Sequence, residues 1–543
     1  MNKRIKALIA CTIVLTTTLV PLGNKMRGIE VKADSEGKAK NVILMVVDGM
    51  STEALTLARY YKGSDLAMDS ITTGGVETYW ENGPITDSAP AATALASGQK
   101  TLNKYIGTSK ENTPLATILE GAEAAGKSTG IIATSEITHA TPADFAAHIE
   151  NRANYNAILR QQINNEMEVV LGGGFGSDSK YEGAGGYEAY KEERINEIKE
   201  EGFSYVETKD QFNKFDGNKL WGSFASADMK YDLDNKLNGS EEPTLSEMTG
   251  KAIDVLNKEE NGFFLMVEGS KVDWAAHANE PAAMASDIVA FDDAVANAIE
   301  FAKADGNTVV IVTTDHGNSG ITIGSNEFNE SVTSYDKATF EQTVDNIKKA
   351  DITEESFTKL INGKSDAEIK KLALQHYGYD LTNDEISIVK TQGIKDIVAK
   401  KCGLGFTTGG HTGEDVYLGV YAPSNVNKLS GVVNNTDINK YMQNILLDGV
   451  TLNDITANNY MDGEVALSKI EGVSLEVQQA ESYNPIVNIT KGDKVVKLEL
   501  FTNNYEIDGE KFESKSVMPY IKGKFYISKE LVDIIASLEG GTR

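Results

Sequence analysis

Four of the six histidines in this 543-residue chain stand beside acidic or small residues in short motifs. They are His139 in "THATPADF", His277 in "DWAAH", His316 in "TDHG" and His411 in "TGGHTGED". Asp273 precedes His277 by four residues, so on a helical turn both side chains would lie on one face and could bind one metal ion. Each motif taken alone is more typical of a helix cap, a turn or a solvent-facing side chain.

Acidic residues stand where three buried strands are expected to end. The apolar runs 41–47, 263–267 and 309–312 are typical of strands buried on both faces of a parallel sheet, and they lead to Asp48, Glu268 and Asp315. Binding sites in open α/β sheets lie at the carboxyl ends of strands. Together, these acids and the histidines supply the nitrogen and oxygen ligands that zinc accepts and the oxygen ligands that magnesium prefers.

One hydroxyl, Ser88, lies at the start of the alanine-rich segment "SAPAATALASG". Pro90 suits the first turn of a helix and Gly98 suits its end. Backbone N–H groups and the positive end of the helix dipole would therefore face Ser88, which is a favourable place for an anion. A serine hydroxyl is a poor nucleophile unless a base or a metal activates it. An N-cap serine explains this segment equally well when it is considered alone.

The elements around these motifs alternate between strands and helices. Apolar residues recur at helical spacing in 114–128, 247–262 and 285–306, and glycine stands near the end of each segment. This alternation predicts a layered α/β fold. Residues 318–405 are rich in lysine and glutamate and favour helix, which indicates an insertion between His316 and His411. From about residue 455 onward, short alternating strands predict a small β-rich part.

The first 33 residues have the pattern of a secretion signal. Three basic residues precede an apolar stretch from Ala7 to Leu22, and residues 31–33 have the spacing of a signal peptidase site. The stretch is short for a membrane-spanning helix and contains four threonines, which makes a retained anchor the weaker alternative. "LIAC", ending at Cys11, resembles a lipoprotein cleavage box, although few apolar residues precede it. We expect a secreted, extracellular protein; association with the cell surface stays open.

The composition excludes several classes of protein. The chain is 41% hydrophobic and 24% charged and has ten prolines, which is typical of a soluble globular protein. Its formal net charge is −28 at pH 7, and removal of residues 1–33, with six basic residues and Glu30, makes it about −33; this disfavours nucleic acid as a partner. Cys402 is the single cysteine after the signal, so the mature chain cannot form an intrachain disulfide.

Six motifs, in order along residues 40–450, resemble those of the alkaline phosphatase family. They are "NVILMVVDGMS", "TDSAPAATA", "THATPADFAAHIENR", "VEGSKVDWAAH", "VVIVTTDHG" and "TGGHTGEDV". The resemblance implies a three-layer α/β/α sandwich around a central, mostly parallel sheet. Residues 34–450 would form the catalytic domain, with a variable insertion at about 318–405, followed by a β-rich module at 455–543. The implied activity is hydrolysis of phosphate monoesters through a phosphoserine, with two zinc ions and one magnesium ion.

The resemblance also implies a role for individual residues. Ser88 matches the nucleophile, Arg152 matches the arginine that binds the phosphate, and Asp87 matches the acid beside it. The implied metal ligands are Asp273, His277 and His411 for the first zinc, Asp48, Asp315 and His316 for the second zinc, and Asp48, Thr141 and Glu268 for magnesium. His139 and Trp274 occupy positions where some members of the family have aspartate and lysine, which leaves the identity of the third metal open.

Two kinds of alternative remain. A phosphodiesterase or sulfatase of the same superfamily would more often have threonine or a modified cysteine as its nucleophile and would lack the pair Thr141 and Glu268. A metal-stabilised surface or phosphate-binding protein without turnover would account for the β-rich tail but not for Ser88. The expected partners are small phosphorylated substrates, with no nucleic acid and no transmembrane span after signal removal. Family members are commonly homodimers.

Two further histidines match no ligand position. We expect His148 and His376 to lie on helix faces or at the surface, without a part in the chemistry. We expect the same of Asp292 and Asp293.

Overall fold

We describe a computed structural model of the protein, which defines residues 37–175, 186–237, 239, 241–325, 339–480 and 484–538. The described residues all belong to one compact unit. The predicted signal at 1–33 lies outside the described residues. Within those residues, no helix combines the length and the apolar character that crossing a bilayer requires.

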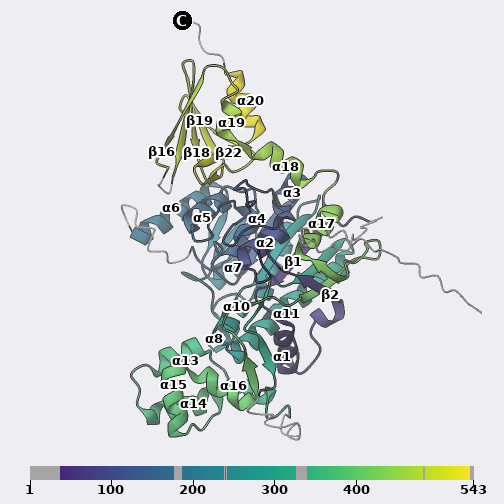
Figure 1. The fold of residues 1–543 in the computed structure, drawn as a ribbon, viewed down its shortest axis with the longest axis vertical. Coiled ribbons are helices and arrows are strands. Elements are labelled where there is room, and N and C mark those ends of the chain that lie inside the picture. The colour runs from purple at the N-terminus through teal and green to yellow at the C-terminus, as the bar shows by residue number, and fades with distance from the viewer. Residues whose placement is uncertain are drawn as a thin grey trace, which may run out of the picture. The chain divides into compact units, whose positions relative to one another are not determined.

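A ten-stranded sheet forms the centre of the fold (Figure 1). Its order is β14-β2-β13-β8-β1-β7-β3-β4-β6-β5. The strands are β1 (Asn41–Val47), β2 (Thr72–Glu77), β3 (Ser128–Ala133), β4 (Val169–Gly172), β5 (Ser204–Val206), β6 (Leu220–Ser223), β7 (Phe263–Gly269), β8 (Thr308–Thr313), β13 (Val416–Tyr421) and β14 (Gly431–Asn434). β13 runs antiparallel to β2 and β8, and the other neighbouring pairs are parallel. The predicted mostly parallel sheet is therefore confirmed.

Helices cover both faces of this sheet because alternate residues of its central strands point in opposite directions. In β1, Ile43 and Met45 pack in one hydrophobic core, together with α1 (Thr52–Lys62), α9 (Leu245–Leu256) and α11 (Pro281–Asp305). Val42 and Leu44 pack in the other core. That second core contains α2 (Ser88–Ser97), α3 (Ile118–Ala124), α4 (Ala140–Ala146) and α17 (Asn435–Leu446). These are the three layers of the predicted sandwich.

Further helices belong to the same part of the chain. They are the 3-10 helix η1 (Met68–Ile71), α5 (Tyr155–Ile163), α6 (Gly186–Glu200), α7 (Lys209–Lys214), α8 (Asp232–Leu237) and α10 (Lys271–His277). The helix expected within 114–128 is only seven residues long. It begins after a capping box formed by Thr117 and Glu120, which sets its start.

The segment predicted as an insertion is helical where it is described. It contains α12 (Val344–Ile347), α13 (Glu354–Ile361), α14 (Asp366–Tyr377), α15 (Asn383–Gln392) and α16 (Ile394–Cys402). Capping boxes start α14 and α15. Two short antiparallel pairs close its base, β10 (Ile321–Ile323) with β11 (Leu404–Phe406), and β9 (Gly317–Asn318) with β12 (His411–Thr412). The second pair brings the segment after His316 back beside His411.

The last part of the chain is rich in antiparallel strands, as predicted. One sheet has five strands: β16 (Val473–Gln478), β17 (Ile486–Lys491), β18 (Lys494–Glu499), β19 (Asn504–Ile507) and β20 (Glu510–Glu513). A smaller sheet joins β15 (Met461–Asp462), β22 (Lys524–Ile527) and β21 (Tyr520–Ile521). The accompanying helices are α18 (Leu452–Asn459), α19 (Gly463–Leu467) and α20 (Lys529–Ser537). We refer to the described residues from 455 to 538 as the C-terminal module.

Candidate active site

The site lies at the carboxyl ends of three neighbouring strands, β1, β7 and β8. Asp48 follows β1, Glu268 is the last residue but one of β7, and Asp315 follows β8. The turn after Asp48 requires glycine, because Gly49 has a φ of 72°. The Gly49 N–H donates to Asp315 Oδ1 at 3.1 Å, and the His316 N–H donates to the same oxygen at 2.9 Å. The backbone therefore fixes one oxygen of Asp315 and leaves the other directed at the site.

Helix α10 places Asp273 and His277 on one face, as their spacing predicts. His277 Nε2 lies 3.3 Å from Asp273 Oδ2. Asn318 Nδ2 donates to Asp273 Oδ1 at 2.7 Å, which holds the carboxylate from the other side. Sequence reasoning did not identify Asn318. Its signal was its place directly after the motif "TDHG", but only the pairing of Asn318 with His411 in β9 and β12 shows why it reaches the site.

His277, His411 and His316 all direct their Nε2 atom into the site. Their Nδ1 atoms face backbone carbonyls: His277 to Gly409 at 2.8 Å, His411 to Thr86 at 2.7 Å and His316 to Gly317 at 3.2 Å. A carbonyl can only accept, so each Nδ1 carries the proton. The Nε2 atoms of His277 and His411 then lie 3.2 Å apart. Such an arrangement presents ring nitrogens to a metal ion.

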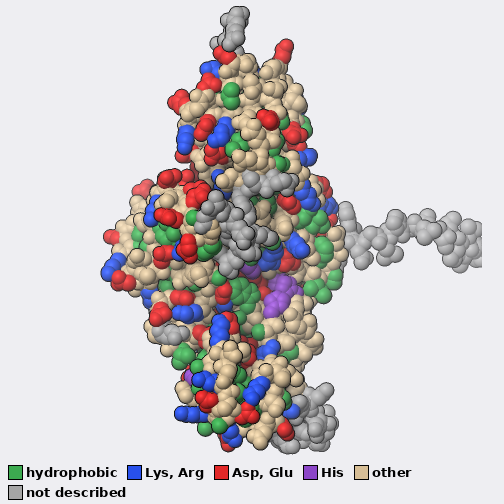
Figure 2. All heavy atoms as spheres, turned by 90° about the vertical axis from the view of Figure 1, so that its left-hand side faces the viewer, with side chains coloured by type: hydrophobic (Ala, Val, Ile, Leu, Met, Phe, Trp, Pro, Cys, Tyr) green, Lys and Arg blue, Asp and Glu red, His purple; other side chains and the backbone are tan. Residues whose placement is uncertain are grey.

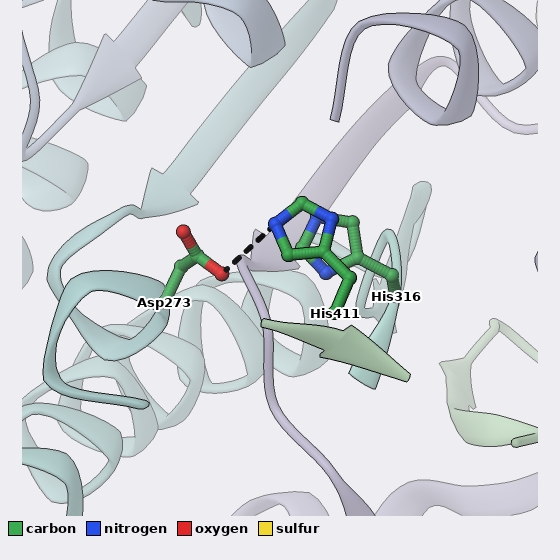
Figure 3. Close-up of side chains that lie close together, drawn as sticks. All are labelled: Asp273, His316 and His411. Atoms are coloured by element: carbon green, nitrogen blue, oxygen red, sulfur yellow. Dashed lines mark ion pairs between the residues drawn. The ribbon is translucent and has the colours of Figure 1, made fainter. Parts of the chain in front are cut away.

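The imidazoles of His316 and His411 stack, with ring centroids 3.6 Å apart, and Asp273 points at them from α10 (Figure 3). His411 Nε2 lies 3.8 Å from Asp273 Oδ1. Histidine side chains reach the surface together at one place in Figure 2. The side chains of His277 and His411 are 40% and 16% exposed, whereas His316 is fully buried. One side of the site is thus open to solvent.

Ser88 is the first residue of α2 and is 2% exposed. Its Oγ lies 3.2 Å from His316 Nε2. The N-cap is Asp87, whose side chain makes no capping hydrogen bond. The hydroxyl of Ser88 is therefore directed at the acidic and imidazole groups of the site, at the positive end of the helix.

Arg152 is held by two neighbours. Its Nη1 lies 2.5 Å from Asp87 Oδ1, and its Nη2 lies 2.8 Å from His139 Nε2. Burial, reinforced by the charge of Arg152, lowers the pKa of His139 to about 3. His139 is therefore neutral and accepts the hydrogen bond, so Arg152 keeps its full charge. The ring of His139 also packs edge-on against Trp274, with centroids 5.8 Å apart.

Several oxygen atoms of the site are buried without a hydrogen-bond partner. They are both carboxylate oxygens of Asp48, Glu268 Oε1, Asp315 Oδ2 and Thr141 Oγ1. Burial, followed by the charge of Asp315, raises the pKa of Asp48 well above its ordinary value. Burial is also the main reason why the pKa of Glu268 rises to about 8. Buried acidic groups without partners are costly, and bound cations remove that cost.

Three groups of side chains offer ligand atoms that all lie within 4.8 Å of one another. They are Asp273 with His316 and His411, Asp48 with Asp315 and His316, and Asp48 with His139 and Glu268. The structure thus brings together the residues expected for the second zinc. It also places Asp273, His277 and His411, the residues expected for the first zinc, in mutual contact. At the expected magnesium site, His139 lies close to Asp48 and Glu268.

The expectation of a surface or helix-face position is wrong for His148, which is fully buried after the end of α4. His376 does lie on helix α14 but is only 7% exposed, and its Nδ1 is 2.8 Å from Asp351 Oδ1. Asp292 is also fully buried. Its carboxylate accepts a hydrogen bond from the backbone N–H of Met68 and pairs with Lys62, so its burial is compensated. None of these residues belongs to the three groups above.

Comparisons with known proteins agree with this geometry. The model of the family "Alkaline phosphatase" matches residues 39–447. Alkaline phosphatase 3 of Bacillus subtilis (strain 168) is 34% identical over 444 residues, which are 78% of this chain and 93% of that protein. The structure of the cold-active alkaline phosphatase of Shewanella sp. has a TM-score of 0.67 at 29% identity and covers 75% of this chain and 100% of its own.

A variant of the alkaline phosphatase of the Antarctic bacterium TAB5 is also similar in structure. It has a TM-score of 0.56 at 26% identity and covers 76% of this chain and 98% of its own. In that variant a histidine is replaced by glutamate, and magnesium is bound in one of its metal sites.

Proposed function

Because the chain belongs to the alkaline phosphatase family and is a phosphomonoester hydrolase, we propose that it acts through Ser88 as the nucleophile and a phosphoserine intermediate. The main support is the position of the Ser88 hydroxyl, 3.2 Å from His316 Nε2 at the start of α2. Buried oxygens without partners lie in the same site. A hydroxyl in such surroundings can become a strong nucleophile.

The donor sets fit three divalent cations. We assign Asp273, His277 and His411 to one zinc ion, Asp48, Asp315 and His316 to a second, and Asp48, Thr141 and Glu268 to magnesium. The mixed nitrogen and oxygen donors of the first two sets suit zinc, and the oxygen donors of the third suit magnesium. The TAB5 variant that holds magnesium has glutamate in place of a histidine, whereas His139 lies beside Asp48 and Glu268 here, so the third assignment rests on the oxygen donors of this chain. When bound, the ions supply positive charge that stabilises the attacking and leaving oxygens of an in-line displacement.

The residues of the chain carry the reaction. Arg152, held in place by Asp87 and neutral His139, binds two non-bridging oxygens of the phosphate. The backbone N–H groups at the start of α2 add donors to the same phosphate. The Ser88 Oγ attacks phosphorus; the Oγ–P bond forms as the bond from phosphorus to the ester oxygen breaks, and the proton that Ser88 gives up is balanced by the one that the ester oxygen takes up as the alcohol leaves. Water then attacks phosphorus, the Oγ–P bond breaks, a proton of that water restores the Ser88 hydroxyl, and inorganic phosphate leaves.

The test compares hydrolysis of p-nitrophenyl phosphate with that of bis(p-nitrophenyl) phosphate and p-nitrophenyl sulfate. We expect the monoester to be the best substrate, with loss of activity in chelator and recovery on addition of zinc and magnesium. Ser88→Ala should lose turnover. Ser97→Ala is the matched control, because Ser97 lies at the other end of α2 and bonds to the backbone oxygen of Thr93.

Acid-quenched enzyme should carry phosphate on Ser88, which peptide mass spectrometry detects. Full activity in Ser88→Ala would refute the nucleophile assignment. Preference for the diester or the sulfate would favour the other activities of the superfamily.

We also propose that residues 1–33 direct export and that the mature enzyme works outside the cell as a homodimer. The support is the signal pattern in the sequence and the common dimers of the family. N-terminal sequencing of the exported protein should begin near Asp34, and light scattering after size-exclusion chromatography gives the oligomeric state. A lipid-modified Cys11 would overturn the first part, and a monomeric mass would overturn the second.

A further inference from the structure

Two neighbouring stretches of chain hold Arg152 in place. Ile106 and Ile149 exchange both backbone hydrogen bonds, at 2.8 and 3.0 Å, and the Arg152 N–H donates to Lys104 O at 2.8 Å. The stretch 104–107 is in turn tied to the serine helix, because the Gly107 N–H donates to Thr93 Oγ1 at 3.1 Å. We call residues 104–108 and 147–152 the phosphate-side segments. Any movement of these segments changes where the guanidinium of Arg152 lies.

The C-terminal module supplies two side chains beneath these segments: Phe501 is buried there, and Tyr520, which is partly buried, packs against the same cluster. Phe501 is 5% exposed and belongs to a buried cluster that is otherwise built from the catalytic part of the chain. The other members of this cluster are Ala89, Ile106, Ala140, Ala143, Ala147, Ile149, Ala157 and Ile158. Ala89 is the neighbour of the nucleophile, and Ile106 and Ile149 are the paired residues of the phosphate-side segments. Phe501 thus fills space directly behind the phosphate side of the site.

The backbone of Phe501 is unusual. Its φ is 65°, a conformation that bulky residues rarely adopt. Its N–H donates to Met518 O at 2.9 Å, within the module. Backbone strain of this kind persists where the surroundings fix it, and it concentrates near functional sites. The strained turn directs the ring away from the core of the module, to which Leu498 and Leu500 contribute, and into the cluster behind Ala89.

A second contact is polar and buried. His148, next to Ile149, is fully buried, and its Nδ1 lies 2.8 Å from Gly107 O. Its Nε2 lies 3.1 Å from Glu120 Oε1 and 2.9 Å from the hydroxyl of Tyr460. The Tyr460 hydroxyl also donates to Glu120 Oε1. Burial alone would raise the pKa of Glu120, but His148 and Tyr460 hold it below its ordinary value. Tyr460 is the member of this network that the C-terminal module supplies.

Two more contacts join the module to the region of residues 105–112. Lys522 Nζ donates to the Tyr105 hydroxyl at 2.6 Å, and the Tyr526 hydroxyl donates to Asn112 O at 2.8 Å. These contacts of the module therefore lie at or beside the segments that carry Arg152, whereas others join the module to α5 and its C-cap, through Arg160 with Leu500 and through Asn504 with Asn164. The family match ends at residue 447, before the module begins.

We propose that the C-terminal module is a positioning element for phosphate binding, acting on Arg152 through Phe501 and Tyr460. This inference rests on the proposed role of Arg152 as the phosphate ligand. The proposed metal ligands and Arg152 all lie in the catalytic part of the chain, outside the module. Its loss should weaken binding of the phosphoryl group more than it slows turnover at saturating substrate.

The experiment measures KM, kcat and the inhibition constant of inorganic phosphate for the full-length, metal-loaded enzyme. Phe501→Ala should raise KM and the phosphate inhibition constant about tenfold, because small misplacements of a positioning group are costly, while kcat changes less than twofold. Tyr460→Phe should act in the same direction by about threefold. Phe501→Leu keeps most of the apolar volume, so its KM and its phosphate inhibition constant should stay close to those of the unaltered enzyme.

Leu498→Ala is the matched control, because Leu498 is fully buried in the separate core of the module. It should leave phosphate inhibition unchanged. Equal effects of Leu498→Ala and Phe501→Ala, or no effect of Phe501→Ala and Tyr460→Phe, would overturn the inference. Arg152→Ala separates this outcome from failure of the proposed function. If Arg152→Ala leaves phosphate inhibition unchanged, the role of Arg152 is wrong; if it weakens inhibition while the module variants do not, only the positioning role is wrong.

Discussion

Gly49 is expected to be essential for the geometry of the metal ligands. A Cβ atom at this position would lie 2.5 Å from Asp273 Oδ1 and 2.8 Å from Asp273 Cα. In Gly49→Ala, the left-handed backbone costs about 1–2 kcal/mol, and the overlap costs about 1–3 kcal/mol more. We therefore expect the free energy of unfolding to fall by about 2–5 kcal/mol. Asp273 must also shift away from residue 49, which disturbs its position beside His277, so zinc affinity should fall.

Gly306→Ala separates the two costs. Gly306 has a φ of 71°, and an added Cβ would meet nothing within 4 Å, so only the conformational cost of about 1–2 kcal/mol applies. Urea unfolding of the chelator-treated variants gives the difference between them, and competition with a zinc chelator gives the affinity of the refilled site. Equal unfolding free energies together with unchanged zinc affinity in Gly49→Ala would refute the argument that Asp273 is packed against the turn.

Three further predictions concern the same site. Because the pKa of Glu268 is raised to about 8 from 4.5, the metal-free folded state keeps a proton that the unfolded state loses between these pH values. The free energy of unfolding of the metal-free protein should therefore fall by about 1.4 kcal/mol for each pH unit through this range. Urea unfolding measures this change; an equal fall with pH in Glu268→Gln would contradict the role of Glu268. A hydrogen bond to Asp273 raises the pKa of His277 to about 9, so zinc uptake at pH 8 should displace about one proton from His277. Calorimetry in buffers of different ionisation enthalpy measures the total proton release, to which Asp48 with its raised pKa also contributes, so this total should fall by about one proton in His277→Gln. Asn318→Ala removes the 2.7 Å hydrogen bond to Asp273 and should weaken zinc binding about 10- to 100-fold. Competition with a zinc chelator measures the affinity, and an unchanged affinity would contradict the role of Asn318 in holding Asp273.

Much of the fold could be predicted because the sequence pattern of a buried parallel strand is strong. Uninterrupted apolar runs come just before Asp48 and Glu268, and a third run is separated from Asp315 by two residues; adjacent parallel strands end at the same edge of a sheet. The four-residue spacing of Asp273 and His277 likewise depends only on local helix geometry. These parts of the site follow from short stretches of chain.

Other features depend on partners that are far away in the sequence. Nothing near His148 predicts that Glu120 and Tyr460 surround its ring, because Tyr460 is 312 residues further along. Its local sequence is equally compatible with an exposed helix face. The burial of a polar side chain is decided by whether distant donors and acceptors satisfy it. The position of Asn318 has the same explanation, since it requires the register of β9 on β12.

The meeting of His316 and His411 shows why a long insertion does not disturb the site. The entropic cost of closing a loop rises only slowly with its length, so the many residues between the two histidines add little to that cost. The pairs β10–β11 and β9–β12 close the base of the segment, and His411 stands opposite Asn318 in the second pair. The same short ladder therefore places a ring nitrogen of the site and the amide that holds Asp273. Changes within α12–α16 should then leave the ligand geometry intact as long as this ladder forms, whereas a shift of one residue in β12 would turn His411 to the opposite face.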